Sequence, residues 1–298
     1  MNTADLFKTQ FVFSFEVYPA KKTAPIEVVY RAVDGLSKLA PDYISVTYGA
    51  GGAAATAAAT VEIASFIKNT CGTLAVAHLP GINLTRAQVQ SLLAALRAHN
   101  ISNVLALRGD RRPQDDASTQ EGDFHHASDL VSYIKELEAQ EEGDQHFNII
   151  AACYPETHCE ATDAQSDLAW LKTKVDAGTA QLVSQLFFDN DVFCRFLEAV
   201  RAAGITVPLQ AGIMPLTNPR QSAHIIELCN PSVPKKLATI IEKYQDDEKS
   251  FHQAGIAYAT EQIADLIERG IDGIHLYTMN SIETAQAITK EIYPILDR

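Results

Sequence analysis

The amino-acid sequence predicts an α/β fold in which one domain forms a closed (β/α)8 TIM barrel. Eight short apolar, β-branched or aromatic runs recur along the 298 residues, and amphipathic segments separate them. Strands that are apolar at most positions and alternate with helices are typical of a parallel sheet. Eight such units favour a closed barrel over an open sheet, and we expect a single domain over residues 1–298.

The eight expected strands follow one another at a spacing close to that of one strand-and-helix unit. They lie at 11–19, 43–49, 73–79, 103–109, 148–156, 181–188, 206–215 and 273–280. Two connections are longer than the others. The first, 110–127, is polar with Gly and Pro and indicates a loop. The second, 216–272, contains the amphipathic stretches 234–244 and 257–270, which predict extra helices before the last strand.

Between the other strands, apolar residues recur at helical spacing. The segments concerned are 25–39, 86–100, 166–178 and 191–204. The segment after the second strand begins GAGGAA at 49–54, which matches the G-x-G-x-x-A pattern of a dinucleotide-binding turn. The next strand ends in His78 and not in an acidic residue placed for a ribose hydroxyl. We therefore interpret residues 50–60 as a flexible, Ala-rich loop over the barrel mouth.

Composition excludes several classes of protein. With 24 Lys+Arg against 37 Asp+Glu the formal charge is −13, which argues against a nucleic-acid partner. The sequence has no apolar run of the roughly 18 residues that a membrane helix needs, and its N-terminus lacks the pattern of a secretion signal. Five irregularly spaced cysteines fit neither a disulfide framework nor a metal site. We expect a cytoplasmic protein without a membrane or nucleic-acid partner.

Active sites of such barrels lie at the carboxyl ends of the strands, and polar residues follow nearly every predicted strand. These are Glu16, Thr47, Tyr48, His78, Arg108, Asp110, Tyr154, Glu156, His158, Gln185 and Tyr277. Glu16 interrupts an apolar strand, so burial suits it to act as a general acid near neutral pH. Pairing of Glu16 with an Arg or Lys inside the barrel is an equal alternative.

The other strand ends support more than one interpretation. In LRGD (107–110), Arg and Asp suit a polar ring edge or a phosphate, although a structural turn closed by Gly-Asp explains the segment as well. His78 and His158 lack a partner His or Cys at a metal-binding spacing, so we expect no metal site. Lys174 could either bind a phosphate or lie on a solvent-exposed helix surface without a ligand.

In this order, the segments FSFEVYP, SVTYGA, ALRGD, YPETH and HLYTMN resemble the bacterial methylenetetrahydrofolate reductases. The resemblance runs from residue 13 to 280. It implies a barrel that binds FAD, accepts a hydride from NADH or NADPH and passes it to methylenetetrahydrofolate in a ping-pong cycle. It also implies one-carbon metabolism, and we expect a homo-oligomer.

The resemblance assigns roles residue by residue. It implies that Glu16 is the general acid that helps to open the five-membered ring of the folate, and that Asp110 tunes the flavin. Thr47 is expected to face the nicotinamide. The implied FAD contacts are Tyr48, Ala50, His78, Arg108, Gly109, Asp110, Ala127, Tyr154, His158, Ala161, Asp167, Trp170, Thr173 and Lys174. The implied substrate contacts are Gln185, Gln221, Tyr277 and Ser281.

The chain departs from the pattern of the resemblance at four places, while Gln221 is retained. The segment after the second strand is rich in Ala where relatives are polar. Thr173 replaces a cation near the FAD diphosphate, so Arg108 and either Lys172 or Lys174 must supply the positive charge. Ser281 stands in place of an Arg, and Ile225 in place of an aromatic residue.

Two further hypotheses remain open at this point. One is a folate- or flavin-binding barrel with impaired turnover, which the residues at positions 225 and 281 support weakly. The other is a cofactor-free lyase or aldolase that uses Lys174 and Glu16.

Overall fold

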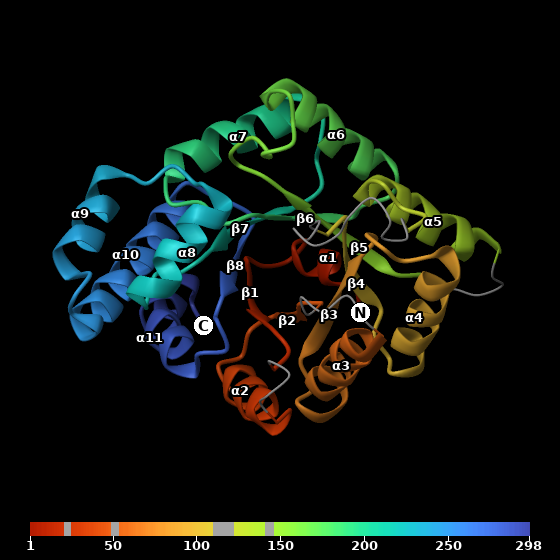
Figure 1. The fold of residues 1–298 in the computed structure, drawn as a ribbon, viewed down its shortest axis with the longest axis horizontal. Coiled ribbons are helices and arrows are strands. Elements are labelled where there is room, and N and C mark those ends of the chain that lie inside the picture. The colour runs from red at the N-terminus through yellow and green to blue at the C-terminus, as the bar shows by residue number, and fades with distance from the viewer. Residues whose placement is uncertain (21–24, 49–53, 110–121, 141–145) are drawn as a thin grey trace.

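Eight parallel strands close into a barrel in the order β1 to β8 (Figure 1). The structure is a computed structural model, and it describes residues 1–20, 25–48, 54–109, 122–140 and 146–298. The strands are β1 (Val12–Val17), β2 (Tyr43–Val46), β3 (Leu74–Pro80), β4 (Asn103–Leu107), β5 (Asn148–Cys153), β6 (Gln181–Ser184), β7 (Leu209–Ile213) and β8 (Gly273–Tyr277). The prediction of a (β/α)8 barrel is confirmed, and each strand lies inside the range expected for it except β3, which extends one residue further, to Pro80.

Helices surround the barrel in the ring that Figure 1 shows. They are α2 (Glu27–Ser37), α3 (Ala54–Ser65), α4 (Arg86–Ala98), α5 (Ala127–Gln140), α6 (Ala164–Asp176), α7 (Asn190–Ala202), α8 (Pro219–Cys229), α9 (Lys235–Tyr244), α10 (Glu248–Glu268) and α11 (Ile282–Ile292). A short 3-10 helix, Tyr293–Leu296, follows α11. Helices α8, α9 and α10 lie between β7 and β8, which confirms the extra helices before the last strand.

The Ala-rich segment after β2 corrects one prediction. Helix α3 begins at Ala54, so most of the segment 50–60 is helical and not a loop. Alanine has the most favourable helix propensity of all residues, and that preference prevails here over the interpretation as a loop. The helix continues into a π-helical turn, Phe66–Thr70. Residues 50–53 and 110–121, which include Ala50 and Asp110, lie outside the described residues.

A short N-terminal helix, α1 (Thr3–Leu6), lies within the ring of strands in Figure 1 and was not predicted. Thr3 is fully buried there. Its Oγ1 donates to Gln181 Oε1 at 2.8 Å and accepts from Asn148 Nδ2 at 2.8 Å, while its backbone N–H donates to Asn103 Oδ1. These three side chains start strands β4, β5 and β6, so α1 closes the amino-terminal end of the barrel.

Most buried apolar residues pack in two layers, and a third, smaller cluster lies around Leu186, Phe188 and Leu216. The larger layer lies between the strands and the surrounding helices and includes Phe13, Phe15 and Val17 of β1. The smaller layer fills the inside of the barrel and includes Val12, Tyr43 and Val76. Alternation along β1 therefore turns Ser14 and Glu16 toward the interior, because neighbouring residues of a strand point to opposite faces. Within the described part of the chain, every helix is too short or too polar to cross a bilayer.

Candidate active site

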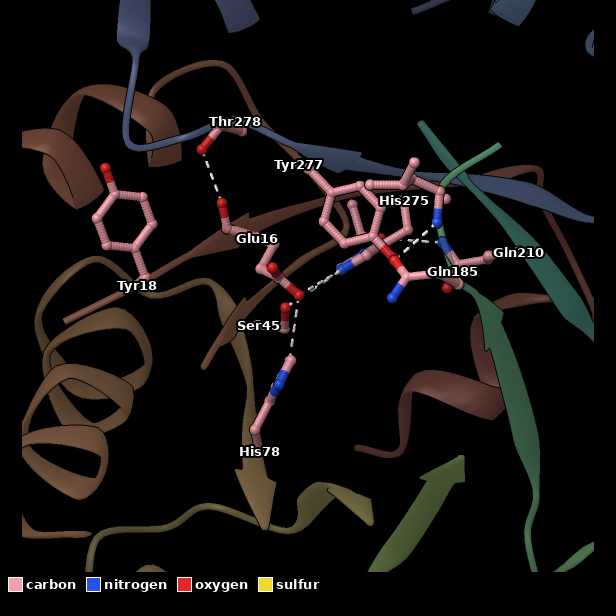
Figure 2. Close-up of polar contacts among 12 residues, drawn as sticks. Glu16, Tyr18, Ser45, His78, Gln185, Gln210, His275, Tyr277 and Thr278 are labelled. Atoms are coloured by element: carbon pink, nitrogen blue, oxygen red, sulfur yellow. Dashed lines mark hydrogen bonds and ion pairs between the residues drawn. The ribbon is translucent and has the colours of Figure 1, made fainter. Parts of the chain in front are cut away.

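Glu16 lies near the carboxyl end of β1, and Figure 2 shows its carboxylate pointing toward two histidine rings. The strand register places it beside Ser45 of β2 and Tyr277 of β8. Its side chain is 19% exposed, so the carboxylate is largely withdrawn from water yet reachable from the mouth. Desolvation and access together suit a group that exchanges a proton with a bound ligand.

Among the described residues, the basic side chains within ion-pair distance of the Glu16 carboxylate are both histidines. Its Oε2 lies 3.4 Å from His78 Nε2 and 3.6 Å from His275 Nε2. The carboxylate thus has imidazole neighbours, and among the described residues neither an Arg nor a Lys pairs with it. A neutral imidazole can donate or accept a hydrogen bond, whereas a guanidinium only donates, so either ring can adapt to a ligand bound beside Glu16.

His78, at the carboxyl end of β3, is buried, and its Nε2 makes no hydrogen bond with any described residue. Burial lowers the pKa of His78, and the nearby Glu16 carboxylate opposes that change only in part. The ring is therefore neutral at neutral pH. An unbonded, buried ring nitrogen at the barrel mouth is available to a ligand, because burial without a partner otherwise costs free energy.

Tyr277 is fixed against β6 and β7 by its hydroxyl group. That hydroxyl donates to Ser184 O at 2.8 Å. Burial raises the pKa of Tyr277 well above its usual value, so the phenol stays protonated. Gly212 leaves room for the ring, because a Cβ at position 212 would lie 2.8 Å from the Tyr277 hydroxyl and 2.2 Å from Ser184 O. The ring therefore forms a wall of the site.

Gln185 and Thr47 follow β6 and β2 at the same end of the barrel. The Gln185 side-chain oxygen accepts a hydrogen bond from Leu186 N, and the Gln185 backbone N–H donates to Cys153 O. Figure 2 shows Gln185 close to the Tyr277 ring. Thr47 N donates to Val17 O across the β1–β2 edge. Tyr48 is half-buried, and burial raises its pKa.

Arg108 and Gly109 follow β4. The Arg108 guanidinium binds both carboxylate oxygens of Glu160, with one N–O distance of 2.9 Å. Gly109 has φ +89, a conformation that favours glycine, and Arg108 Nε donates to its carbonyl oxygen.

The loop after β5 is tied to the first turn of α6. Asp167 Oδ2 accepts from His158 N at 2.9 Å, and the Tyr154 and His158 rings meet edge to face with centroids 4.6 Å apart. Ala161 N donates to His158 O. Glu156 takes a different role, because its carboxylate accepts from the backbone and hydroxyl of Ser232. It links this loop to the α8–α9 connection.

A cavity of about 250 Å³ lies between this loop and helices α6 and α7. Tyr154, Asp167 and Lys174 line it from the predicted site, and Arg195 and Phe196 line it from α7. Lys174 Nζ donates to Ala152 O at 2.6 Å, and burial lowers its pKa. The prediction left a solvated helix surface as an alternative for Lys174, and its position at this buried wall contradicts that alternative.

The outer face of α6 carries the other predicted contacts. Trp170 is half exposed and stacks on His126, with ring centroids 4.7 Å apart, and Ala127 begins α5 beside that histidine. Thr173 is exposed and donates to Ala169 O. Lys172 pairs with Asp176 at 2.5 Å on the surface. Of the two lysines considered as cations, Lys174 is therefore the one that faces the cavity.

Three predicted substrate-side positions follow β7 and β8. Ser281 caps α11, and its hydroxyl accepts from Thr284 N at 3.2 Å. Gln221 is exposed in the first turn of α8. Ile225, also on α8, packs in the same apolar cluster as Tyr277. The structure thus places Ile225 with Tyr277, whereas it uses Ser281 in a helix cap.

His275 is the site residue that the sequence analysis missed. It is fully buried in β8, its Nδ1 lies 2.7 Å from Ser14 Oγ, and its Nε2 lies 3.3 Å from Ser45 Oγ. The period of two in a strand could have found it, because His275 and Tyr277 share a face. No three His, Cys, Asp or Glu side chains converge as metal ligands would within the described ranges.

Comparisons with known proteins agree on one family. A family model for methylenetetrahydrofolate reductase matches residues 2–293. Methylenetetrahydrofolate reductase (NADH) 1 of Arabidopsis thaliana is 37% identical over 289 residues, which cover 94% of this chain and 48% of that protein. The 5,10-methylenetetrahydrofolate reductase of Escherichia coli (strain K12) is 33% identical over 279 residues, which cover 94% and 90% of the two chains. The chain spans about half the length of the plant relatives that it matches.

A solved structure supports the fold independently of close sequence similarity. It is described as an uncharacterized protein from Clostridium thermocellum that binds two copies of 5-methyl-5,6,7,8-tetrahydrofolic acid. Its TM-score is 0.68 at 13% sequence identity, and the match covers 97% of this chain and 98% of that chain. At that identity the likeness concerns the barrel alone.

Proposed function

Because the chain belongs to the methylenetetrahydrofolate reductase family, we propose that it reduces methylenetetrahydrofolate to methyltetrahydrofolate with NADH or NADPH as reductant. In this proposal FAD is the cofactor, and nicotinamide and folate occupy the barrel mouth in turn, in a ping-pong cycle. Glu16 is the general acid that protonates the folate as its five-membered ring opens.

The observation that carries the proposal is the setting of Glu16. Its carboxylate is largely buried at the mouth of the barrel, and its Oε2 lies 3.4 Å from His78 Nε2 and 3.6 Å from His275 Nε2. A carboxyl group that is partly withdrawn from water, open to the mouth and flanked by imidazoles is placed to give a proton to a bound folate.

The residues present fit a dinucleotide such as FAD. Lys174 and Arg195 border the cavity of about 250 Å³ between the β5 loop and helices α6 and α7, which suits a diphosphate or a polar ring edge. The Nε2 of His78, which hydrogen-bonds to none of the described residues, and the positive φ of Gly109 suit close approach of a ring and a backbone contact. FAD, when bound, supplies the hydride-transfer chemistry, and the protein supplies position, a proton and an electrostatic field.

The remaining parts of the proposal concern the whole molecule. We propose that residues 1–298 form one domain that binds FAD, that the protein works in the cytoplasm and that it assembles as a homo-oligomer. Asp110 belongs to the proposed site as a tuning group for the flavin, and Ala50 as a backbone contact. Thr47 faces the nicotinamide and Gln185 the folate.

Replacement of Glu16 by Gln tests the general acid. In anaerobic stopped flow, Glu16→Gln should still lose its flavin absorbance with NADH at nearly the wild-type rate. Recovery of that absorbance with methylenetetrahydrofolate should slow by about 10²- to 10⁴-fold, because the amide has no acidic proton to give. The matched control is Glu291→Gln, an exposed change at the far end of α11, which should leave both rates unchanged.

Other outcomes would select the other hypotheses. Equal loss in both half-reactions would remove the general-acid role of Glu16. Tight folate binding by the wild-type protein without product would indicate a barrel with impaired turnover. A colourless protein that cannot be reconstituted with FAD, and whose Lys174 is trapped on substrate by borohydride, would indicate a lyase or aldolase.

A further inference from the structure

A chain of buried hydrogen bonds runs along the inside of the barrel from the plug helix α1 to His275, which lies beside Glu16. Its members are polar residues from α1 and from strands β1, β2, β5, β6, β7 and β8. In order they are Asn148, Thr3, Gln181, Tyr43, Gln210, Ser14 and His275. Each of these residues is less than one-tenth exposed. Glu16 Oε2 lies 3.6 Å from His275 Nε2, just beyond hydrogen-bond distance. Figure 2 shows the end of the chain that reaches the mouth.

The side-chain amide of Gln210 determines which residue donates and which accepts along this chain of hydrogen bonds. Its Nε2 lies 2.9 Å from Ile274 O, and a backbone carbonyl accepts but never donates, so the NH₂ end of the amide must point there. Its Oε1 consequently accepts from the Tyr43 hydroxyl and from Gln181 Nε2. The same Nε2 donates to Ser14 Oγ at 2.9 Å. The orientation of this amide follows from its partners alone.

Ser14 accepts from Gln210 and in turn donates to His275. Its Oγ accepts from Gln210, so its own proton must go to another acceptor. His275 Nδ1 lies 2.7 Å away and Ile274 O lies 3.3 Å away, and the shorter distance favours the ring nitrogen. Nδ1 therefore accepts, and in the neutral ring the proton is on Nε2. That nitrogen faces Ser45 Oγ at 3.3 Å and Glu16 Oε2 at 3.6 Å.

We infer that His275 is a positioning residue for Glu16, held by Ser14 and Gln210 in the tautomer whose Nε2–H group faces the Glu16 carboxyl group at 3.6 Å and closes to a hydrogen bond when the carboxylate forms during the reaction. The inference rests on Glu16 being the acid of the proposed reaction. When Glu16 has given its proton to the folate, the Nε2–H group of His275 stabilises the carboxylate that remains, and no proton leaves the imidazole.

His78 lies near the same oxygen but does not share this arrangement. Its Nε2 is 3.4 Å from Glu16 Oε2 and has no hydrogen-bond partner among the described residues. The structure thus places one directed imidazole and one unbonded imidazole beside Glu16. Of the two, His275 is the one that the interior chain of hydrogen bonds fixes.

The first test is spectroscopic and needs neither substrate. In the flavin-loaded protein labelled with ¹⁵N-histidine, long-range ¹H–¹⁵N correlations report which imidazole nitrogen carries the proton. His275, assigned from the signals lost in His275→Gln, should carry its proton on Nε2, and Ser14→Ala should reduce that preference. A proton on Nδ1, or protons on both nitrogens, in the wild-type protein would overturn the inference.

The second test compares two substitutions of similar size in the half-reactions. His275→Leu removes the donor and should slow the folate half-reaction by about 10- to 100-fold, the effect expected of one hydrogen bond to a charged group. His275→Gln keeps an N–H near the position of Nε2 and should recover most of that loss. Both variants should be reduced by NADH at about the wild-type rate, as should the control His99→Gln at the exposed end of α4.

The outcomes separate this inference from the proposed function. If the wild-type protein shows no folate half-reaction, the proposed function fails, while the tautomer of His275 is still measured independently. If Glu16→Gln is impaired but the Leu and Gln variants of His275 lose equal activity, or none, the donor role of His275 is wrong. In that case Glu16 keeps its proposed role and His275 serves only packing.

Discussion

The buried hydroxyl of Thr3 offers a sharp test of how α1 closes the barrel. Thr3→Val keeps the shape of the side chain but removes its Oγ1, which donates to Gln181 Oε1 and accepts from Asn148 Nδ2, both at 2.8 Å. Among the described residues, neither Gln181 Oε1 nor Asn148 Nδ2 makes another hydrogen bond, so each atom would lose its partner. A buried polar group left without a partner costs about 1–3 kcal/mol. We therefore expect Thr3→Val to lower the free energy of unfolding by about 2–5 kcal/mol, allowing for some relaxation between neighbours.

The measurement is urea denaturation of the flavin-loaded protein, followed by far-ultraviolet circular dichroism. Thr9→Val is the matched control, because Thr9 is exposed and its hydroxyl only donates to Leu6 O at 3.3 Å. A surface change of this kind should stay within about 0.5 kcal/mol of the wild-type value. If Thr3→Val and Thr9→Val have equal effects, the hydrogen bonds of Thr3 do not hold α1 in the barrel.

Two further predictions concern the ionisable groups at the mouth. Because burial lowers the pKa of His78 in the folded protein, the unfolded chain binds a proton there first as the pH falls below about 6.5. Stability should thus decrease between pH 7 and 5, and His78→Gln should make that decrease shallower in urea titrations; an identical slope would contradict the neutral buried state. Lys174→Met should weaken FAD binding by about tenfold or more in fluorescence titrations, the effect of losing one charged contact, whereas Lys172→Met should change it by less than about twofold. Equal effects of the two lysine substitutions would place the diphosphate elsewhere.

The sequence was sufficient for the barrel because each strand is a short apolar run with a helix after it. It was not sufficient for α1, since four residues are too few to show a helical period, and Thr3 is buried only because the barrel provides Gln181 and Asn148 around it. The prediction of a loop for the Ala-rich segment after β2 was wrong, because the glycines at its start favour a loop only locally, whereas the alanines that follow favour helix α3.

The candidate site, like the fold, could be predicted from the sequence only in part. Glu16 was predictable because a carboxylate in an apolar strand is unusual, and the barrel rule placed it at the mouth. Its two imidazole partners come from β3 and β8, and only the closure of the barrel brings them to one oxygen. The sequence could not show which of Lys172 and Lys174 faces the cavity, because both are lysines on the same helix. They are two positions apart on α6 and so point to different faces, one to Asp176 and the other to the cavity.

Product analysis of the wild-type protein tests the proposed reaction most directly. Purified, flavin-loaded protein is incubated anaerobically with NADH and methylenetetrahydrofolate, and both the NADH consumed and the folates formed are measured by chromatography with mass spectrometry. The proposed reaction predicts one methyltetrahydrofolate for each NADH oxidised, and almost none with Glu16→Gln. Oxidation of NADH without methyltetrahydrofolate, or equal product from Glu16→Gln, would contradict it.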